Sequence, residues 1–564
     1  MQTTRFKHIA YLVELCVKNG IKEAVISPGS RNAPLIIALE SHPQIKTHLI
    51  HDERVAAFFA LGMADASASP VILTCTSGSA LLNYAPAIAE AYYRQVPLLV
   101  LSADRPAELI DQGDGQTIRQ SAVFRNFIKR SFDFPNHDAV NLFENSCEIA
   151  KQLVASVIHQ PQGPVQLNIP LEEPLYEVAD YTFQEVPELN VENSSSLKDE
   201  DLAPILNAWK TAEKKMIIVG QLHPDQKIAE LLKNMAADPS VAVLVENTSN
   251  VQEFSSISHT IDRSLATIGE KDLQKFAPDL LLTLGGAVIS KRIKGYLRKF
   301  KPQYNWRIGQ FLIQSDTYQS ATGFIDQDPE VVLSHILKAE IPPTSNYGGM
   351  WKQKDLLAQE VHEQFLSTTP LSDLKVFEVL FDCLPDDSNL HMGNSSVVRY
   401  CQLFNPIPGI HYFSNRGVSG IDGSSSTAAG FAQMNKLKLN TLITGDISFF
   451  YDSNAFWNRQ KIDNLKVVVI SNGGGAIFQI IPGPSSSAHA NTFFAPTLAK
   501  VKGICDAYDV NYYSCSSLEK LEEGFTQLFQ KEENERPSVL EIFTQDCNNA
   551  EILEAYFQAL NRLQ

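Results

Sequence analysis

Residues 441–478 read TLITGDISFFYDSNAFWNRQKIDNLKVVVISNGGGAIF, and this stretch decides the expected fold. Two apolar runs, 441–443 and 467–470, have the composition of buried β-strands, and an amphipathic segment that we expect to be helical separates them. Two parallel strands joined by a helix bring the loops that follow them to one edge of a sheet, where α/β proteins bind ligands. Those loops hold Asp446 and the run from Asn472 to Gly475. Such oxygen donors and glycines predict a site for Mg²⁺ and a diphosphate.

Length, composition and net charge limit the kinds of protein that this chain can be. With 564 residues the chain is long enough for three or four domains, and 44% hydrophobic and 20% charged residues are typical of a globular protein. The formal net charge of −17 argues against broad contact with nucleic acid or anionic membranes. A local basic pocket for an acidic ligand stays compatible with it.

The cysteines and the apolar runs indicate a cytoplasmic protein that is not inserted in a membrane. The eight cysteines are scattered without a CxxC pair, so neither a zinc site nor a disulfide framework is predicted. The first 20 residues have the pattern of an amphipathic helix rather than of a signal peptide. No apolar run approaches the roughly 20 residues that a membrane-spanning helix needs.

Strand-like and helix-like segments alternate along the chain, which predicts an α/β fold with parallel sheets. The expected strands include 23–27, 47–50, 70–75, 97–102, 164–174, 216–220, 241–247, 280–286 and 538–544. Polar or Pro/Gly-rich stretches at 175–200 and 341–349 are plausible linkers. We therefore predict three α/β domains, with the boundaries 1–185, 186–349 and 350–564.

Several motifs have a structural and a functional interpretation. Glu53, where an extended segment becomes a helix, is by itself an ordinary first-turn residue favoured by the helix dipole. The loop 27–31, SPGSR, could be only a well-capped turn or an anion site at a helix N-terminus. Lys291-Arg292, Arg399 and Arg416 could each be solvated surface cations, but together they suggest a site for a substrate with several carboxylates.

The motifs together resemble one family of thiamine diphosphate (ThDP) enzymes. They are ISPGSRNAPL (26–35), HDERVAAFFALGMA (51–64), TSGSA (76–80), SADRPAELIDQGDGQTIRQ (102–120), GNSSVVR (393–399), SNRGVSGIDGSSSTAAG (414–430), GDIS with YD (445–452) and NGGGAIF (472–478). In this order they are similar to the 2-succinyl-5-enolpyruvyl-6-hydroxy-3-cyclohexene-1-carboxylate synthases of menaquinone biosynthesis. The pattern GD followed by Asn, here 26 residues apart, is shared by ThDP enzymes in general, whereas the arginine-bearing motifs are specific to this family.

The resemblance implies a role for individual residues. Asp446, Asn472 and the Gly474 carbonyl are implied to bind Mg²⁺ or Mn²⁺, and Glu53 to hydrogen-bond the aminopyrimidine of ThDP. The other residues implied to contact the cofactor are Ser77, Gly78, Asn394, Ile421, Ile447, Ser448, Gly475, Ile477, Phe478 and Ile481. The residues implied to bind isochorismate are Ser30, Arg31, Arg105, Gln116, Lys291 and Arg292. Ser395, Arg399 and Arg416, also implied to be catalytic, are expected to hold the carboxylate derived from 2-oxoglutarate. One departure is Ser471, where the family often has Asn.

The resemblance also implies the reaction and the assembly. The family is a group of transferases that decarboxylate 2-oxoglutarate and join the resulting succinyl group to isochorismate by 1,4-addition, releasing CO₂. A homodimer or homotetramer with active sites at subunit interfaces is implied. Two alternatives stay open: another ThDP-dependent 2-oxo acid decarboxylase or carboligase of the acetolactate synthase kind, and a non-catalytic binding protein. A nicotinamide dehydrogenase is disfavoured because no GxGxxG motif follows an early strand.

Overall fold

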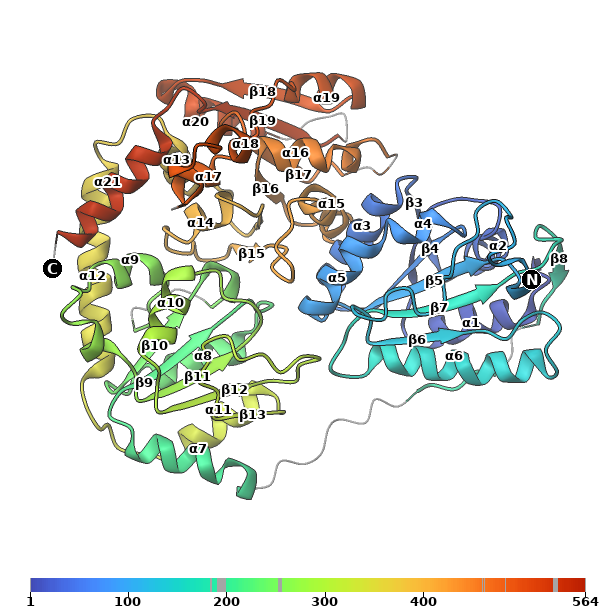
Figure 1. Cartoon of the computed structure of the whole chain (residues 1–564), viewed down its shortest axis with the longest axis horizontal. Coiled ribbons are helices and arrows are strands. Elements are labelled where there is room, and N and C mark those ends of the chain that lie inside the picture. The colour runs from blue at the N-terminus through green and yellow to red at the C-terminus, as the bar shows by residue number, and fades with distance from the viewer. Residues whose placement is uncertain are drawn as a thin grey trace. The chain divides into compact units, whose positions relative to one another are not determined.

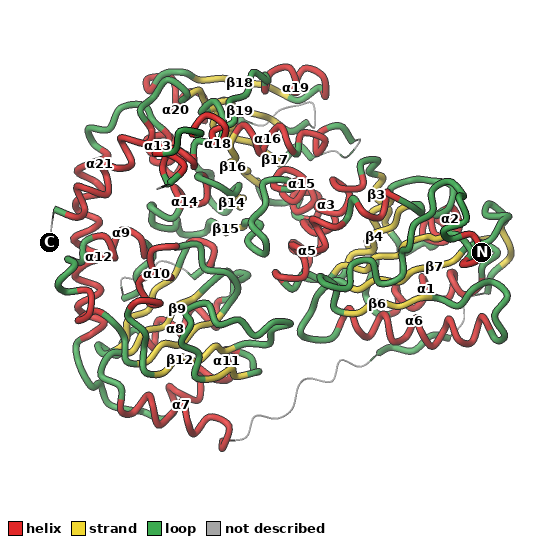
Figure 2. The backbone as a smooth tube through the Cα atoms, viewed as in Figure 1, coloured by secondary structure: helices red, strands yellow, loops and turns green. Residues whose placement is uncertain are grey.

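The structure, a computed structural model, describes residues 2–182, 185–189, 199–251, 256–458, 460, 462–481, 483–530 and 536–562. It contains three parallel sheets with helices packed against them, which confirms the predicted α/β class (Figures 1 and 2). The chain divides into two compact units. The first comprises 1–193, 417–437 and 451–465, and the second comprises 194–416, 438–450 and 466–564. Each unit is described by itself.

The first unit is built on a six-stranded parallel sheet with the order β3-β2-β4-β5-β7-β6. Its strands are β2 (Glu23–Ile26), β3 (Lys46–Leu49), β4 (Val71–Cys75), β5 (Leu98–Asp104), β6 (Arg130–Asp133) and β7 (Val165–Pro170). Its helices are α1 (Lys7–Lys18), α2 (Ala33–Ser41), α3 (Glu53–Ser67), α4 (Ser79–Leu82), α5 (Ala85–Arg94), α6 (Leu142–Ile158) and α15 (Ser424–Met434). Buried side chains of α1, α2 and α6 share one apolar cluster with the sheet.

Helices α3 and α15 of this unit approach each other unusually closely. A Cβ atom on Gly62 of α3 would lie 2.0 Å from the carbonyl oxygen of Thr427, and one on Gly430 of α15 would lie 2.0 Å from the carbonyl oxygen of Phe59. Glycine is therefore required on both helices, because any side chain would force the two backbones apart. The contact fixes the helix whose first residue is Glu53.

The second unit contains the other two sheets. Its five-stranded parallel sheet has the order β10-β9-β11-β12-β13. The strands are β9 (Lys215–Val219), β10 (Val241–Val245), β11 (Leu280–Leu284), β12 (Tyr304–Ile308) and β13 (Gly323–Ile325). The helices of this part are α7 (Asp199–Thr211), α8 (Gln226–Met235), α9 (Ile261–Ala266), α10 (Lys291–Lys299), α11 (Pro329–Lys338) and α12 (Tyr347–Leu366).

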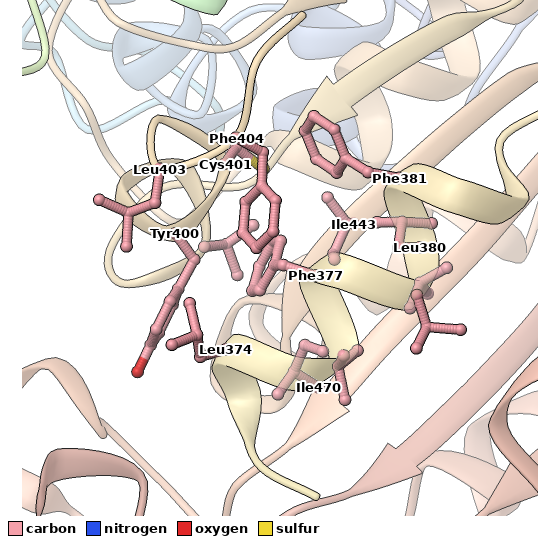
Figure 3. Close-up of a cluster of buried hydrophobic side chains, with 14 of the residues drawn as sticks. Leu374, Phe377, Leu380, Phe381, Tyr400, Cys401, Leu403, Phe404, Ile443 and Ile470 are labelled. Carbon is pink, nitrogen blue, oxygen red and sulfur yellow. The ribbon is translucent and has the colours of Figure 1, made fainter. Parts of the chain in front are cut away.

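The last sheet has six strands in the order β15-β14-β16-β17-β19-β18. They are β14 (Asn389–Met392), β15 (His411–Phe413), β16 (Asn440–Gly445), β17 (Leu465–Ser471), β18 (Asn511–Cys515) and β19 (Ser538–Phe543). The accompanying helices are α13 (Asp373–Cys383), α14 (Val397–Cys401), α16 (Asp446–Tyr451), α17 (Ile477–Ile480), α18 (Ala490–Phe494), α19 (Val501–Tyr508), α20 (Leu521–Phe529) and α21 (Asn549–Asn561). Figure 3 shows the apolar cluster in which α13 and α14 pack on this sheet, with Phe377, Phe404 and Ile470 among its buried side chains.

The first and last sheets share one topology. Numbered within its own sheet, each has the strand order 2-1-3-4-6-5. In such a sheet the connections from strands 1 and 3 leave in opposite directions, which opens a crevice for a ligand at the carboxyl ends of those strands. The crevice positions are the loops after β2 and β4 in one sheet and after β14 and β16 in the other.

Some predicted elements differ from the structure. The segment between β16 and β17 is not one helix: α16 ends at Tyr451, and a 3₁₀ turn and loop follow. The helix predicted within the first 20 residues, α1, begins only at Lys7, because β1 (Gln2–Thr4) pairs with β8 (Val178–Asp180). Part of the predicted linker 175–200 lies outside the described residues. Among the described helices, none combines the length and apolarity required to cross a bilayer.

We predict that Gly62→Ala destabilises the first unit by about 1–3 kcal/mol, because the added methyl group overlaps the Thr427 carbonyl. Urea denaturation followed by circular dichroism measures the shift. Gly295→Ala is the matched control, since no atom lies within 4 Å of the new methyl group in helix α10. The control is expected to be neutral or stabilising by up to about 1 kcal/mol. If the unfolding transition of the first unit occurs at the same urea concentration in Gly62→Ala as in wild type, the close packing of α3 and α15 is contradicted.

Candidate active site

Asp446 lies at the carboxyl edge of the last sheet, as the first residue of α16, directly after β16. Its carboxylate accepts hydrogen bonds from the N–H of Ile447 at 2.7 Å and of Gly473 at 3.0 Å. Gly473 follows β17, so the bond joins the loops after two neighbouring strands. Burial raises the pKa of Asp446 to about 6, and the two N–H donors oppose that rise. The structure therefore brings together the two loops that the sequence paired.

Asn472 is oriented by a residue that the sequence did not reveal. Its side-chain Nδ2 donates to Asp373 Oδ2 at 3.0 Å, and Thr544 Oγ1 donates to Asp373 Oδ1 at 2.6 Å. Asp373, only 1% exposed, is itself fixed because its N–H donates to Asn549 Oδ1 at 2.7 Å. Since Asp373 holds the amide nitrogen, the Oδ1 of Asn472 is the atom left to bind a cation.

The glycines after Asn472 allow this loop to lie very close to the backbone of Phe494. Gly474 has φ +155, and a Cβ there would lie 2.6 Å from the carbonyl oxygen of Phe494. The N–H of Gly475 donates to the same carbonyl at 2.6 Å, and the Gly474 carbonyl accepts from Ala476 N–H at 2.9 Å. Ile477 and Phe478 begin the short helix α17 directly after this turn, with Ile481 just beyond it.

These residues fit a divalent cation bound through mixed oxygen ligands. Within the described ranges, no group of three or more His, Cys, Asp or Glu side chains could hold a metal by itself. Asp446, the Asn472 amide oxygen and the Gly474 carbonyl supply one charge and two neutral oxygens. Mg²⁺ commonly has few protein ligands and takes its remaining ligands from water and phosphate. The donor set therefore suits a cation that arrives with a diphosphate.

Cationic side chains of the second unit gather around two buried carboxylates. Arg416 Nη1 donates to Asn394 Oδ1 at 2.5 Å, in the loop after β14 that also holds Ser395. Burial lowers the pKa of Arg399, while the negative charges of Asp262 and Glu246 oppose this. The Nε of Arg399 is buried and has no hydrogen-bond partner among the described residues. Arg399 and Arg416 therefore both lie within the electrostatic influence of Glu246.

Glu246 and Asp262 hold the start of helix α10. The Glu246 carboxylate accepts from the N–H groups of Ile289 and Ser290, both at 2.7 Å, and the Ser290 hydroxyl donates to Asp262. Burial raises the pKa of Glu246 to about 7. Lys291 and Arg292, the next residues, are both exposed, and the Arg292 guanidinium lies 4.0 Å from the centre of the Phe557 ring. Arg292 is thus stacked on α21 in this structure.

In the first unit, the loops after β2 and β4 meet at the crevice of the first sheet. Arg31 N–H donates to Thr76 Oγ1 at 3.3 Å, and a Cβ on Gly29 would lie 2.4 Å from the Thr76 Cβ. Arg31 is 5% exposed, and its guanidinium donates to the Leu171 carbonyl at 2.9 Å and pairs with the Glu173 carboxylate at 3.4 Å. Burial and the nearby charge of Arg105 lower the pKa of Arg31. Two cations are thus held close together at this edge.

Ser77 and Gly78, in the loop after β4, lie against Gln116. Ser77 Oγ donates to the carbonyl of Gln116 at 2.9 Å, and Gly78 has φ +88, where a Cβ would lie 3.1 Å from Gln116 Cα. Ser30 is exposed in the loop before α2. Ile421 lies in the segment that leads into α15. The loop after β4 therefore packs directly on the backbone of Gln116.

Glu53 is half-buried at the first position of α3. The helix is capped by Asp52, whose Oδ1 accepts from Val55 N–H at 3.2 Å and whose Oδ2 accepts from Asn454 Nδ2 at 2.7 Å. The charge of Glu53 contributes to the raised pKa values of Cys75 and Tyr84, so its carboxylate lies close to β4. The cap leaves the Glu53 side chain available for a ligand.

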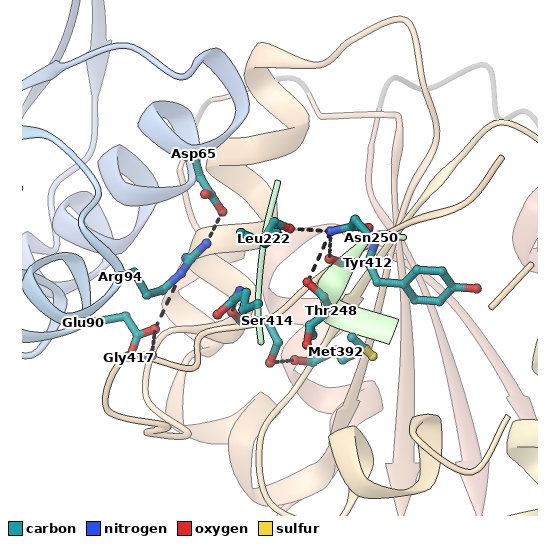
Figure 4. A network of polar contacts seen from close by, with 11 residues as sticks. Asp65, Glu90, Arg94, Leu222, Thr248, Asn250, Met392, Tyr412, Ser414 and Gly417 are labelled. Atoms are coloured by element: carbon teal, nitrogen blue, oxygen red, sulfur yellow. Dashed lines mark hydrogen bonds and ion pairs between the residues drawn. The ribbon is translucent and has the colours of Figure 1, made fainter. Parts of the chain in front are cut away.

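A buried polar network fixes the loop that begins directly after Arg416. Figure 4 shows Glu90, which accepts from the N–H of Gly417 at 2.7 Å, and Arg94, which donates to Asp65 at 2.6 Å. The N–H of Val418 also donates to Glu90, at 2.7 Å. Arg94 Nε also lies 4.0 Å from Glu90. The carboxylate of Glu90 is 1% exposed, so these N–H donors and Arg94 compensate for the cost of burying its charge.

The chain is similar to known proteins over nearly its whole length. The family model described as the thiamine pyrophosphate enzyme, N-terminal TPP binding domain, matches residues 7–123. A 2-succinyl-5-enolpyruvyl-6-hydroxy-3-cyclohexene-1-carboxylate synthase from Flavobacterium johnsoniae is 40% identical over 554 residues, covering 97% of this chain and 98% of that protein. The chain belongs to this synthase family. A synthase of the same name from Porphyromonas gingivalis is 36% identical over 571 residues, covering 98% and 96% of the two chains.

A solved structure of another protein has a similar fold. Benzoylformate decarboxylase from Polynucleobacter necessarius has a TM-score of 0.71 and 17% sequence identity, covering 97% of this chain and 100% of that chain. The predictions of the synthase family and of ThDP as cofactor are confirmed by the relatives and the matched domain. The three domain boundaries and the roles of individual residues stay predictions.

We predict that Asp373→Ala weakens binding of ThDP with Mg²⁺ by about tenfold to a hundredfold, because Asn472 loses the partner that orients it. Quenching of tryptophan fluorescence during a ThDP titration at fixed Mg²⁺ measures the affinity. Asp382→Ala, an exposed position in the same helix, is the matched control and is expected to bind normally. Thermal melting of both variants checks the fold. Wild-type affinity in a folded Asp373→Ala protein contradicts the orienting role.

Proposed function

We propose that the chain is a ThDP-dependent transferase of menaquinone biosynthesis that decarboxylates 2-oxoglutarate and adds the succinyl group to isochorismate, releasing CO₂. The product is the compound in the relatives' name, 2-succinyl-5-enolpyruvyl-6-hydroxy-3-cyclohexene-1-carboxylate. The observation that carries the substrate assignment is the group of cations around Arg399 and Arg416, which suits substrates with several carboxylates. A small substrate with a single carboxylate requires no such excess of positive charge.

Two sets of residues are proposed to hold the cofactor. Asp446, Asn472 and the Gly474 carbonyl would bind Mg²⁺ or Mn²⁺, which would in turn hold the diphosphate. Glu53 would hold a proton against N1′ of the aminopyrimidine. When bound, ThDP supplies the carbon nucleophile and the electron sink that decarboxylation of a 2-oxo acid requires. The partly buried position of Glu53 and the cap at Asp52 support this role, because they keep the carboxylate in one place.

The arginines are proposed to bind and orient the two substrates. Arg399, Arg416 and Ser395 would hold the distal carboxylate of 2-oxoglutarate. Arg31 and Arg105 would receive carboxylates of isochorismate, with Ser30, Gln116, Lys291 and Arg292 completing the contacts. Preorganised cations stabilise negative charge that develops on a substrate carboxylate during addition, and they do so without reorganisation cost. The burial of Arg31 and the partial burial of Arg399 and Arg416 strengthen this effect by excluding water.

We propose a cytoplasmic location. All eight cysteines are free thiols in the structure, and five of them are buried. Free thiols are typical of a reducing compartment.

The proposed activity predicts CO₂ release that depends on both substrates. Purified chain with ThDP, Mg²⁺, 2-oxoglutarate and isochorismate is expected to release CO₂ rapidly and to form an adduct detectable by mass spectrometry. Omitting isochorismate or replacing 2-oxoglutarate with pyruvate is expected to abolish adduct formation. Equal turnover with pyruvate contradicts the proposed substrate and favours a carboligase of another kind.

We also propose a homodimer or homotetramer with active sites at subunit interfaces. The support is that Glu53 and the metal ligands belong to separate compact units of the chain. If one chain supplies Glu53 and another supplies Asp446, a mixture of Glu53→Gln and Asp446→Ala chains forms some dimers with one intact site. Unfolding and refolding the two inactive variants together is then expected to restore up to about a quarter of wild-type turnover. A mixture that stays inactive although light scattering shows oligomers contradicts shared sites.

A further inference from the structure

We infer that Glu541, on β19, is a positioning residue of the metal site: it fixes the loop that holds Asn472, and its charge strengthens binding of the divalent cation. The inference rests on the proposed metal site at Asp446, Asn472 and Gly474, and it adds a residue that no motif of the sequence indicated. It also gives a role to Ser471, the residue at which the cofactor motif departs from the common family pattern.

Three polar side chains form a row across neighbouring strands of the last sheet. They are Tyr512 of β18, Glu541 of β19 and Ser471 of β17, and β19 lies between the other two strands (Figure 1). The parallel registers pair Glu541 with Val469 of β17 and with Ser514 of β18. Ser471 and Tyr512 each lie two residues from these partners, and residues two apart in a strand project from the same face of the sheet. Glu541 can therefore reach both side chains.

The carboxylate of Glu541 joins the three strands through two hydrogen bonds. The Ser471 hydroxyl donates to Glu541 Oε1 and the Tyr512 hydroxyl donates to Glu541 Oε2, both at 2.6 Å. Glu541 is 6% exposed, so its carboxylate is removed from solvent and is held by two neutral donors. Ser471 is the last residue of β17 and directly precedes Asn472. The hydrogen bond therefore fixes the strand end from which the metal loop begins.

The metal loop is held from both faces of the sheet. Ile470, which precedes Ser471, belongs to the apolar cluster that contains buried residues of α13. Helix α13 begins with Asp373, the residue that binds the amide of Asn472. Successive strand residues project from opposite faces, so Glu541 binds Ser471 on the face away from α13. Two acids thus hold two consecutive residues of the chain.

The two hydroxyls leave the charge of Glu541 uncompensated beside the metal loop. Burial raises the pKa of Asp446, and the charges of Asp373 and Glu541 add to that rise, so Glu541 lies within electrostatic reach of the proposed metal ligand. A divalent cation is attracted by each of these charges, and the attraction is stronger where water is excluded. Groups that orient metal ligands from behind typically change metal affinity by about tenfold to a hundredfold.

The test measures Mn²⁺ binding and requires no turnover. The full chain in excess ThDP is titrated with Mn²⁺, and electron paramagnetic resonance of free Mn²⁺ gives the affinity and the number of sites, with a protein-free ThDP titration as the baseline. Glu541→Gln removes the charge but keeps an acceptor for Ser471, and it is expected to weaken Mn²⁺ binding at least about tenfold at an unchanged number of sites. Glu551→Gln, which alters an exposed glutamate of α21, is the matched control and is expected to bind like wild type.

Two substitutions at Ser471 separate the hydrogen bond from the charge. Ser471→Ala removes the donor to Glu541 and is expected to weaken Mn²⁺ binding about threefold to tenfold, the equivalent of one net hydrogen bond. Ser471→Thr keeps a hydroxyl at this position and is expected to retain most of the affinity.

Wild-type Mn²⁺ affinity in Glu541→Gln overturns the inference. Fewer sites with unchanged affinity also overturns it, because a misfolded loop would then be the cause. Equal weakening in Glu551→Gln overturns it as well, since the loss of any negative charge would suffice. If wild type itself binds no Mn²⁺ with ThDP, the proposed metal site fails. If wild type binds both yet forms no product, the proposed reaction is wrong and the role of Glu541 stands on the binding data.

Discussion

The candidate cofactor site depends on buried carboxylates that are held by N–H and O–H donors rather than by cations. Asp446 is bound by two backbone N–H groups, and Asp373 by an amide and a hydroxyl. Neutral donors satisfy the oxygens yet leave the negative charge uncompensated, and burial raises the pKa of both acids. A divalent cation is the natural partner for such a charge. The same bonds fix the loops after β16, β17 and β19 against one another, so metal affinity and local rigidity have one origin.

The cationic group of the second unit follows the opposite pattern. Glu246 and Asp262 accept hydrogen bonds from residues at the start of α10, while their charges still attract Arg399. The consequence is a fixed helix start beside cations whose charge the two acids partly compensate. The first unit uses Glu90 in a related way, because its carboxylate fixes the backbone directly after Arg416. Acidic side chains thus hold backbone N–H groups in both units of an acidic chain.

The features that could be predicted from the sequence are those that depend on the pattern of neighbouring residues. Apolar runs of β-branched residues identified the parallel strands, and glycines after β4 and β17 identified loops with close backbone approach. Contacts between distant segments were not predictable: Asp373 bonds Asn472 across 99 positions, and a lone Asp after Ser372 has the pattern of an ordinary helix cap. Glu246 directly follows the buried strand β10, and nothing local reveals that its partners are Ile289 and Ser290. The segment after Asp446 was predicted to be a single helix, because the spacing of its apolar residues does not show where α16 ends.

The placement of α15 has a consequence for biosynthesis. This helix belongs to the first unit, yet it is encoded between β15 and β16 of the last sheet. A ribosome therefore releases the first sheet and α3 long before the helix that covers α3 exists. The glycine-lined face of α3, with Phe58 and Phe59 beside it, stays exposed to solvent during that interval. Domains generally fold as units, N-terminal first, but here an apolar surface must wait for most of the chain before its covering helix is made.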